Sequence, residues 1–243
     1  MLRLLLFCCC FLGTACQHRE ADFEQFWQRY QQARWVQFPD WASSAGQVEA
    51  HAILVIPSAA KRTSDRQFCQ RYLDTLTQFD PQRLSPDWQS QYLALSEQLN
   101  GYLQQLDTAV NYASDPSYYN VKGSFQHVLQ QIDLPLENKL RLLYTKMQSV
   151  PQYYETAKSN LQSPDRLTTQ KAIHAHEATF QFFYHSLPDS LQVAQWSSQE
   201  QERFQRVLLQ AQLAIKSYVA FCQSIEFEFA QLDNQGMDSK EEE

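Results

Sequence analysis

Apolar residues recur three and four positions apart along most of this chain, which is the period of a helix with one buried face. Short joints separate these stripes, and most carry a proline, before which the chain leaves helical conformation. The longest stripe comprises Phe204, Leu208, Ala211, Ile215, Tyr218, Cys222, Ile225 and Phe229. The intervals in this stripe alternate between four and three residues, which permits a coiled coil. Neighbouring apolar residues widen the stripe, however, and a wide stripe favours the core of a helical bundle.

The same pattern predicts the other elements. Helices are expected over residues 17–34, 64–79, 86–114, 125–132, 136–147, 151–161, 165–187 and 198–232. One strand-like run, residues 52–56, ends at Pro57; because a lone strand cannot form a sheet, we expect an extended segment lying against helices. The predicted fold is therefore all-α: an irregular multi-helix bundle with long antiparallel helices and one extended segment near the N-terminus. We expect a single helical domain over residues 21–232 and a disordered acidic tail over 233–243.

The N-terminal residues 1–15 have the features of an export signal. Arg3 precedes a short apolar run, and the small residues 13–15 are followed directly by Cys16. This order is typical of a bacterial lipoprotein, in which the cysteine carries the lipid, so residues 16–20 are expected to begin a tether. Ordinary secretory cleavage after Ala15 is the alternative. We favour a lipid-anchored protein of the bacterial cell envelope, on the periplasmic or surface side. The expected partner is the membrane, to which a lipid on Cys16 would attach the protein.

Charge and cysteine content limit which partners this protein can bind and which disulfides it can form. The formal net charge is −7 and no basic face with interleaved aromatic residues occurs, which argues against nucleic acid. With the signal removed, Cys69 and Cys222 are the cysteines left in the body of the protein. They could form one disulfide in an oxidising envelope, and a buried free thiol at Cys222 is the equal alternative.

The run His174-Ala-His176-Glu177 is the nearest approach to a catalytic motif. A zincin helix requires HExxH, because histidines four apart share one helix face, but the second ligand position here is Phe180. His174 and Glu177 share a face and remain candidates for a weak two-ligand metal site. The favoured interpretation is a polar face beside a core His176 that is hydrogen-bonded. We therefore expect no metal, no other cofactor and no catalytic residue in this chain.

Two tyrosine pairs could line a groove together with His176. The pairs are Tyr118-Tyr119 and Tyr153-Tyr154. Aromatic residues at helical spacing lie in a core more often than in a groove, so both interpretations are kept. No nucleophile elbow, phosphate loop or dinucleotide fingerprint occurs.

The central stretch resembles a large bacterial family known as domain of unknown function 885. The resemblance rests on SDPSYYNVKGSF at residues 114–125, LPLENKLRLLYTKMQSVPQYYETAKSNLQSP at 134–164 and SLPDSL at 186–191. Weaker similarity includes FPDWASSAGQ at 38–47, ILVIP at 53–57 and LSPDWQSQYLAL at 84–95. Together these segments reach from about residue 21 to residue 231.

The resemblance implies an all-helical protein related to zinc metallopeptidases. Family members are typically more than twice as long, and their HExxH-type motif lies in the C-terminal half. The present chain corresponds to the N-terminal half, so no catalytic or zinc residue is carried over. The first hypothesis is a non-catalytic binding or scaffold lipoprotein that recognises a peptide or a protein partner. The alternatives are one half of a split or truncated zinc metallopeptidase that needs a separately encoded HExxH-bearing part, and a gene fragment without a role.

Overall fold

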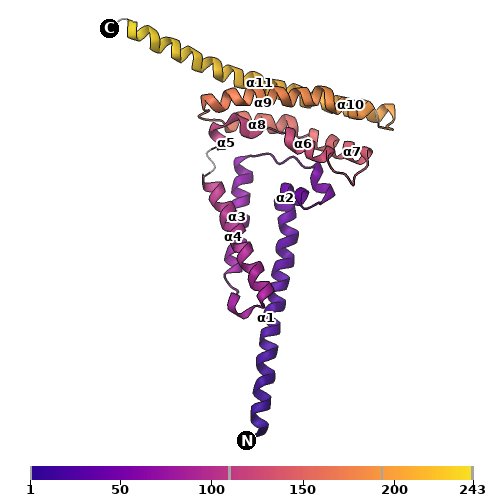
Figure 1. The fold of residues 1–243 in the computed structure, drawn as a ribbon, viewed down its shortest axis with the longest axis vertical. Helices are drawn as coiled ribbons and strands as arrows, with labels where there is room; N and C mark the ends of the chain where they lie inside the picture. The colour runs from indigo at the N-terminus through magenta and orange to yellow at the C-terminus, as the bar shows by residue number, and fades with distance from the viewer. Residues whose placement is uncertain (1, 109–110, 193, 242–243) are drawn as a thin grey trace. The chain divides into compact units, whose positions relative to one another are not determined.

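The computed structural model describes residues 2–108, 111–192 and 194–241; for 2–19, 191–192 and 234–241 it describes the backbone alone. These residues form helices and no strand, which confirms the predicted all-α class. Their contacts divide them into two compact units (Figure 1). Unit 1 comprises residues 1–42 and 59–109, and unit 2 comprises 43–58 and 110–243. A single domain over 21–232 stays a prediction, and the structure adds that this range contains two cores.

Unit 1 is built from α1 (Leu2–Gln37), the start of α2 (Pro39–Ser44), α3 (Ala59–Leu76), the short η2 (Pro81–Arg83) and α4 (Pro86–Thr108). Aromatic rings fill its interior. Phe23 meets Phe79 and Trp88 edge to face, with ring centroids 5.2 and 5.4 Å apart. Edge-to-face rings add to the burial energy of these large side chains. The buried residues of this core are Phe23, Phe26, Tyr30, Phe38, Phe68, Cys69, Leu76, Leu84, Leu95 and Leu99.

Unit 2 contains the remaining elements, and the last helix is the one against which the others pack. They are η1 (Val48–Ala52), α5 (Asn111–Ser114), η3 (Pro116–Tyr119), α6 (Lys122–Leu129), α7 (Leu136–Met147), α8 (Val150–Asn160), α9 (Arg166–Gln181), the π-helical η4 (Phe182–Ser186), α10 (Leu187–Gln192) and α11 (Ser198–Glu241). Figure 1 shows α9 and α10 running alongside α11. Helices α7, α8 and α9 all contact α11. The wide apolar stripe of α11 therefore serves a bundle core, as predicted.

The extended segment lies where the sequence placed it. Residues 53–58 have no helical or strand assignment. Leu54 packs against the core of unit 2, and the side-chain amide of Asn160 donates to the carbonyl of Pro57 over 2.7 Å. An extended chain has unpaired backbone groups, and this bond satisfies one of them.

The backbone is helical in both terminal segments that the structure describes. Helix α1 begins at Leu2, within the predicted export signal, and α11 continues to Glu241. Asp233 is helical and forms an ion pair with Arg166, and a disordered tail over 233–243 stays a prediction. The Cys16 side chain lies outside the described side chains. Among the described residues, no helix has the length and apolar character needed to cross a bilayer.

Candidate functional site

The predicted tyrosine groove is instead part of the core of unit 2. Tyr119, Tyr154 and His176 are fully buried, Tyr153 is 8% exposed, and Tyr118 alone is exposed. The rings of Tyr119, Tyr153 and Tyr154 contact one another or the buried Tyr218 edge to face or tilted. The groove interpretation is thus corrected for four of its five residues. The physical reason is that three elements bring these large rings to one point, where burying them is more favourable than exposing them.

His176 is a core histidine held by hydrogen bonds at both ring nitrogens. Its Nε2 lies 3.3 Å from the carbonyl oxygen of Pro116, which can only accept, so Nε2 carries the proton. Its Nδ1 then accepts from the hydroxyl of Tyr154 over 3.2 Å. The hydroxyl of Tyr218 donates to the same Pro116 oxygen over 2.9 Å. This arrangement fixes one tautomer of a neutral imidazole and ties α9 and α11 to η3.

Burial sets the protonation of this cluster. It lowers the pKa of His176 to about 4, although the hydrogen bond to Pro116 opposes the shift. Burial also raises the pKa of Tyr154 and of Tyr218. At neutral pH all three side chains are uncharged. Because none is accessible, the cluster supports the fold and has no route to a substrate.

His174 and Glu177 lie on the exposed face of α9, as predicted. The Nδ1 of His174 is 3.8 Å from Oε2 of Glu177, and both side chains are more than half exposed. Within the described part of the chain, no third His, Cys, Asp or Glu joins them in a group that could hold a metal ion. Two exposed groups on one helix turn do not provide the three protein ligands of a catalytic zinc site.

These two residues instead form part of the rim of a groove between α9 and α11, which we call the α9–α11 groove. Its volume is about 600 Å³. The apolar lining comes from Ala178, Phe180, Val219 and Ala220, and the polar lining from His174, Glu177, Gln181, Lys216 and Gln223. The two alanines leave the hollow, because longer side chains at these positions would fill it. An apolar floor with a polar rim is the usual construction of a binding groove.

A second hollow of about 320 Å³ continues along the same helix. It is lined by Tyr184, Pro188, Gln201, Gln205, Leu208, Leu209 and Gln212. The rings of Phe180 and Tyr184 stack 5.8 Å apart and so join the two hollows. Tyr184 lies in the π-helical η4, where the widened backbone turn is stabilised by Gln212, whose amide donates to the carbonyl of Phe183 over 2.8 Å. The sequence predicted one uninterrupted helix here, because periodicity does not reveal a π turn.

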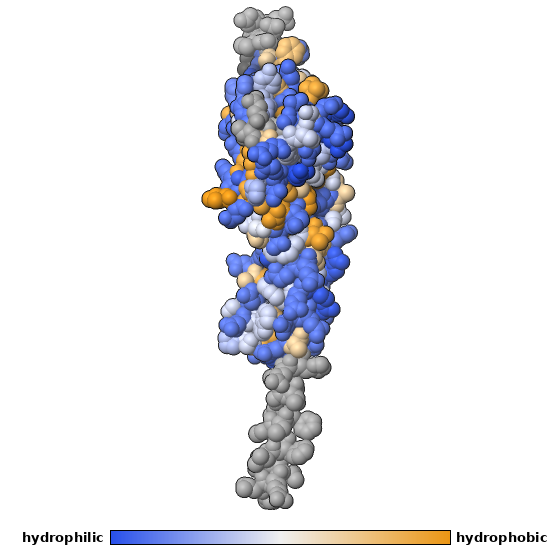
Figure 2. Space-filling model, turned by 90° about the vertical axis from the view of Figure 1, so that its right-hand side faces the viewer, coloured by the Kyte–Doolittle hydropathy of each residue, from blue (hydrophilic) through white to orange (hydrophobic). Residues whose placement is uncertain are grey.

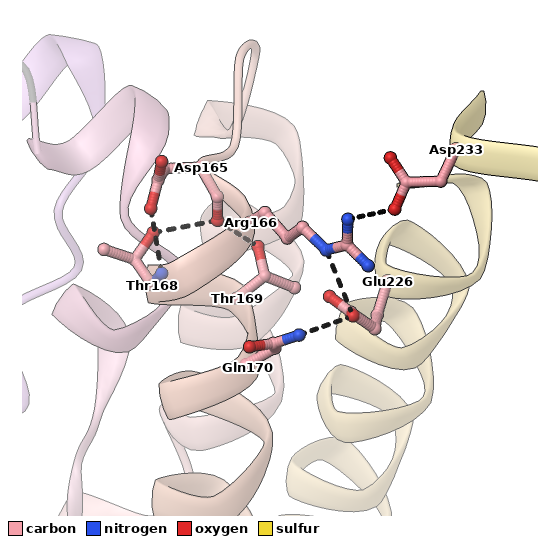
Figure 3. Close-up of polar contacts among 7 residues, drawn as sticks. All are labelled: Asp165, Arg166, Thr168, Thr169, Gln170, Glu226 and Asp233. Carbon is pink, nitrogen blue, oxygen red and sulfur yellow. Dashed lines mark hydrogen bonds and ion pairs between the residues drawn. The ribbon is translucent and has the colours of Figure 1, made fainter. Parts of the chain in front are cut away.

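Polar contacts fix how α9 and α11 pair at the far end of the groove (Figure 3). Asp165 caps α9 by accepting from a backbone N–H three residues on, over 2.9 Å. Arg166 pairs with Glu226 and Asp233 of α11, and Gln170 donates to Glu226 over 2.7 Å. The first turn of α9 therefore meets the last part of α11, so the two helices are antiparallel and their register is fixed.

The two cysteines of the body are both free and buried, one in each unit's core. The structure therefore contains the free-thiol alternative rather than a disulfide between Cys69 and Cys222. Burial raises the pKa of Cys69 to about 11 and that of Cys222 to about 12. Both are thiols at neutral pH, and buried thiols of this kind are poor nucleophiles.

Large apolar side chains are exposed at separate places in both units. Figure 2 shows one face of the molecule, on which apolar side chains reach the surface between hydrophilic areas. Tyr184 and Leu209, which line the second hollow, are each more than half exposed. Sequence reasoning missed the α9–α11 groove, since a helix stripe identifies a buried face but does not show which two helices leave a hollow between them.

Comparisons with known proteins give a family and a fold. A family model described as "Bacterial protein of unknown function (DUF885)" matches residues 39–238. A solved structure from Shewanella oneidensis, described as "a putative lipoprotein of unknown function", is similar with a TM-score of 0.78 and 24% identity. The likeness covers 86% of this chain and 38% of that one, so the present chain spans less than two fifths of its relative. At this identity the likeness concerns the fold. No curated protein matches the chain.

Proposed function

Because the chain belongs to the DUF885 family of bacterial proteins, we propose that it is a non-catalytic lipoprotein of the cell envelope that binds a helix of a partner protein. The α9–α11 groove carries this proposal. It has an apolar floor and a polar rim, and with the second hollow it follows residues 201–223 of α11, a length of about 33 Å at ~1.5 Å per residue.

A helix suits this surface better than a small ligand does. The two hollows follow each other along α11, and the exposed Leu209 lines the second of them. An amphipathic helix places apolar side chains at intervals of three and four residues, which matches two hollows joined by a stacked pair of rings.

Photo-cross-linking tests the groove in cells. A benzoylphenylalanine at Ala220, on the floor of the groove, is expected to cross-link one envelope protein through an amphipathic helix, identified by mass spectrometry of the joined peptides. The same residue at Gln152, an exposed position on α8, is expected to give no such product. A product with the mass of two copies of this chain, or equal products from both positions, would overturn the proposal.

A matched pair of variants tests the contribution of the apolar edge. Leu209 and Leu167 are 55% and 58% exposed, but of the two only Leu209 lines one of the two hollows. We expect Leu209→Asp to reduce the cross-link from position 220 by about tenfold, because burying a carboxylate in an apolar contact is unfavourable. Leu167→Asp should leave it unchanged, and both variants should unfold at the same urea concentration as the parent.

The lipid anchor gives a separate prediction. Cys16→Ser should remove incorporation of radiolabelled fatty acid and move the protein from the membrane fraction to the soluble fraction. A single acyl chain binds a bilayer only marginally, so attachment depends on the full lipid modification at this cysteine. A Cys16→Ser protein that stays in the membrane fraction after a carbonate wash would show that another feature holds it there.

The second candidate function is one half of a split zinc metallopeptidase. The observation that favours it is that the likeness covers 38% of the relative, so the relative is longer than the part that this chain matches. In this case the cross-linked partner would carry an HExxH helix, and co-expression of the two chains would give zinc-dependent hydrolysis of peptides. A partner without that motif would leave the binding lipoprotein as the function.

A further inference from the structure

A second, chemically different pocket lies between α7 and the start of α11. We call it the Arg141–Arg203 pocket. Its volume is about 310 Å³, and its lining residues are Arg141, Tyr144, Thr145, Trp196, Glu200 and Arg203. This volume is at the lower end of the range for pockets that hold small molecules. The pocket is built within unit 2, and it shares no lining residue with the α9–α11 groove.

The charges of this pocket do not cancel. The guanidinium of Arg141 pairs with Oε1 of Glu200 over 3.0 Å. The other carboxylate oxygen, Oε2, accepts from the backbone N–H and the hydroxyl of Ser197 over 3.0 and 2.8 Å. These hydrogen bonds lower the pKa of Glu200, so its carboxylate is negatively charged at neutral pH. Arg141 and Ser197 already occupy its two oxygens. None of the ion pairs found among the described residues includes Arg203. A protein of net charge −7 thus has a locally cationic pocket.

Flat side chains and a second donor complete the lining. The guanidinium of Arg141 lies 5.5 Å from the centre of the Trp196 ring, and Tyr144 contributes another ring. The indole Nε1 of Trp196 is buried and has no hydrogen-bond partner within the described residues. Such a donor is rarely left without an acceptor, because its desolvation is not offset.

We propose that the Arg141–Arg203 pocket binds a small carboxylate that carries a flat apolar group. Arg203 takes the carboxylate, because its guanidinium presents donors in the fork that matches two carboxylate oxygens. The flat group lies against the rings of Tyr144 and Trp196. Free aromatic carboxylates and the C-terminal residue of a peptide share this chemistry. The proposal does not depend on the α9–α11 groove.

Tryptophan fluorescence measures this binding on the full chain. Trp196 is the one tryptophan of unit 2, since Trp27, Trp35, Trp41 and Trp88 belong to unit 1. Titration with N-acetyl-L-phenylalanine should change the emission in a saturable way, and a Trp196→Phe variant should lose this change. N-acetyl-L-phenylalaninamide has no carboxylate, so it should bind at least about tenfold more weakly. An acetylated tetrapeptide that ends in phenylalanine tests the other source of the ligand. If the tetrapeptide binds more tightly than N-acetyl-L-phenylalanine, the ligand is the end of a peptide. If it binds more weakly, the ligand is a free small molecule.

Two arginine variants complete the test. Arg203→Gln should weaken binding of N-acetyl-L-phenylalanine by about tenfold or more. Arg206→Gln is the matched control, because Arg206 lies on the same helix outside the pocket, paired with Glu202 over 2.9 Å; its affinity should stay as in the parent. The proposal is overturned by equal binding of acid and amide, by equal losses in the two variants, or by no saturable signal from Trp196.

Discussion

Replacing Tyr218 with alanine should destabilise the protein by about 3–5 kcal/mol, the range for removing a large aromatic side chain from a core. Tyr218 is fully buried, and its ring centre lies 4.8 Å from that of His176 and 4.9 Å from that of Tyr154. Its removal leaves a cavity where η3, α8, α9 and α11 meet. Urea unfolding followed by far-ultraviolet circular dichroism, which reports both units, measures the loss.

Two further variants divide this loss into its parts. Tyr218→Phe keeps the ring and removes the hydroxyl, and the Pro116 carbonyl still accepts from His176, so we expect a cost of only about 1 kcal/mol. Tyr118→Ala serves as the control, because that tyrosine belongs to the predicted groove set but is 51% exposed. It should change stability by about 0.5 kcal/mol or less. A large effect of Tyr118→Ala, with little effect of Tyr218→Ala, would restore the groove interpretation.

The helical stripes could be predicted because each is a local property of the sequence. Leu95 and Leu99 of α4 are buried, as are seven of the eight residues of the predicted α11 stripe, from Phe204 to Ile225. What the stripes could not show is that two separate cores receive them. A periodic pattern identifies which face of a helix is buried. It does not identify which helix packs against that face. A chain with one core and a chain with two cores therefore show the same periodic pattern.

Features of the candidate sites could be predicted where they depend on residues that are close together in the sequence. The polar face with His174 and Glu177 and the core position of His176 follow from helical spacing and are found. The Arg141–Arg203 pocket joins residues about 60 positions apart, so spacing does not reveal it. One local signal was present: Ser197 and Glu200 form a capping box, and this fixes the carboxylate that Arg141 meets.

Lowering the pH from 7 to 5 should destabilise the protein by about 2 kcal/mol through His176 alone. The pKa of this side chain is lowered by burial from 6.5 to about 4 in the folded protein. Between these values the unfolded chain binds a proton that the folded protein does not, so stability falls as the pH falls through this window. Below about pH 4 both states are protonated and the loss stops at about 3 kcal/mol, since one pKa unit corresponds to ~1.36 kcal/mol. Burial also lowers the pKa of His51, which adds a loss of the same sign.

The variant His176→Gln isolates this contribution. A glutamine amide can still donate to the Pro116 carbonyl, and it does not titrate. It should be less stable than the parent at pH 7, because the hydrogen bond from Tyr154 and the packing against Tyr218 change. Its stability should nevertheless fall less than that of the parent between pH 7 and 5, by about 2 kcal/mol. Equal pH dependence in both proteins would mean that His176 is protonated in the folded state near pH 6. The buried neutral imidazole on which the core assignment rests would then be wrong.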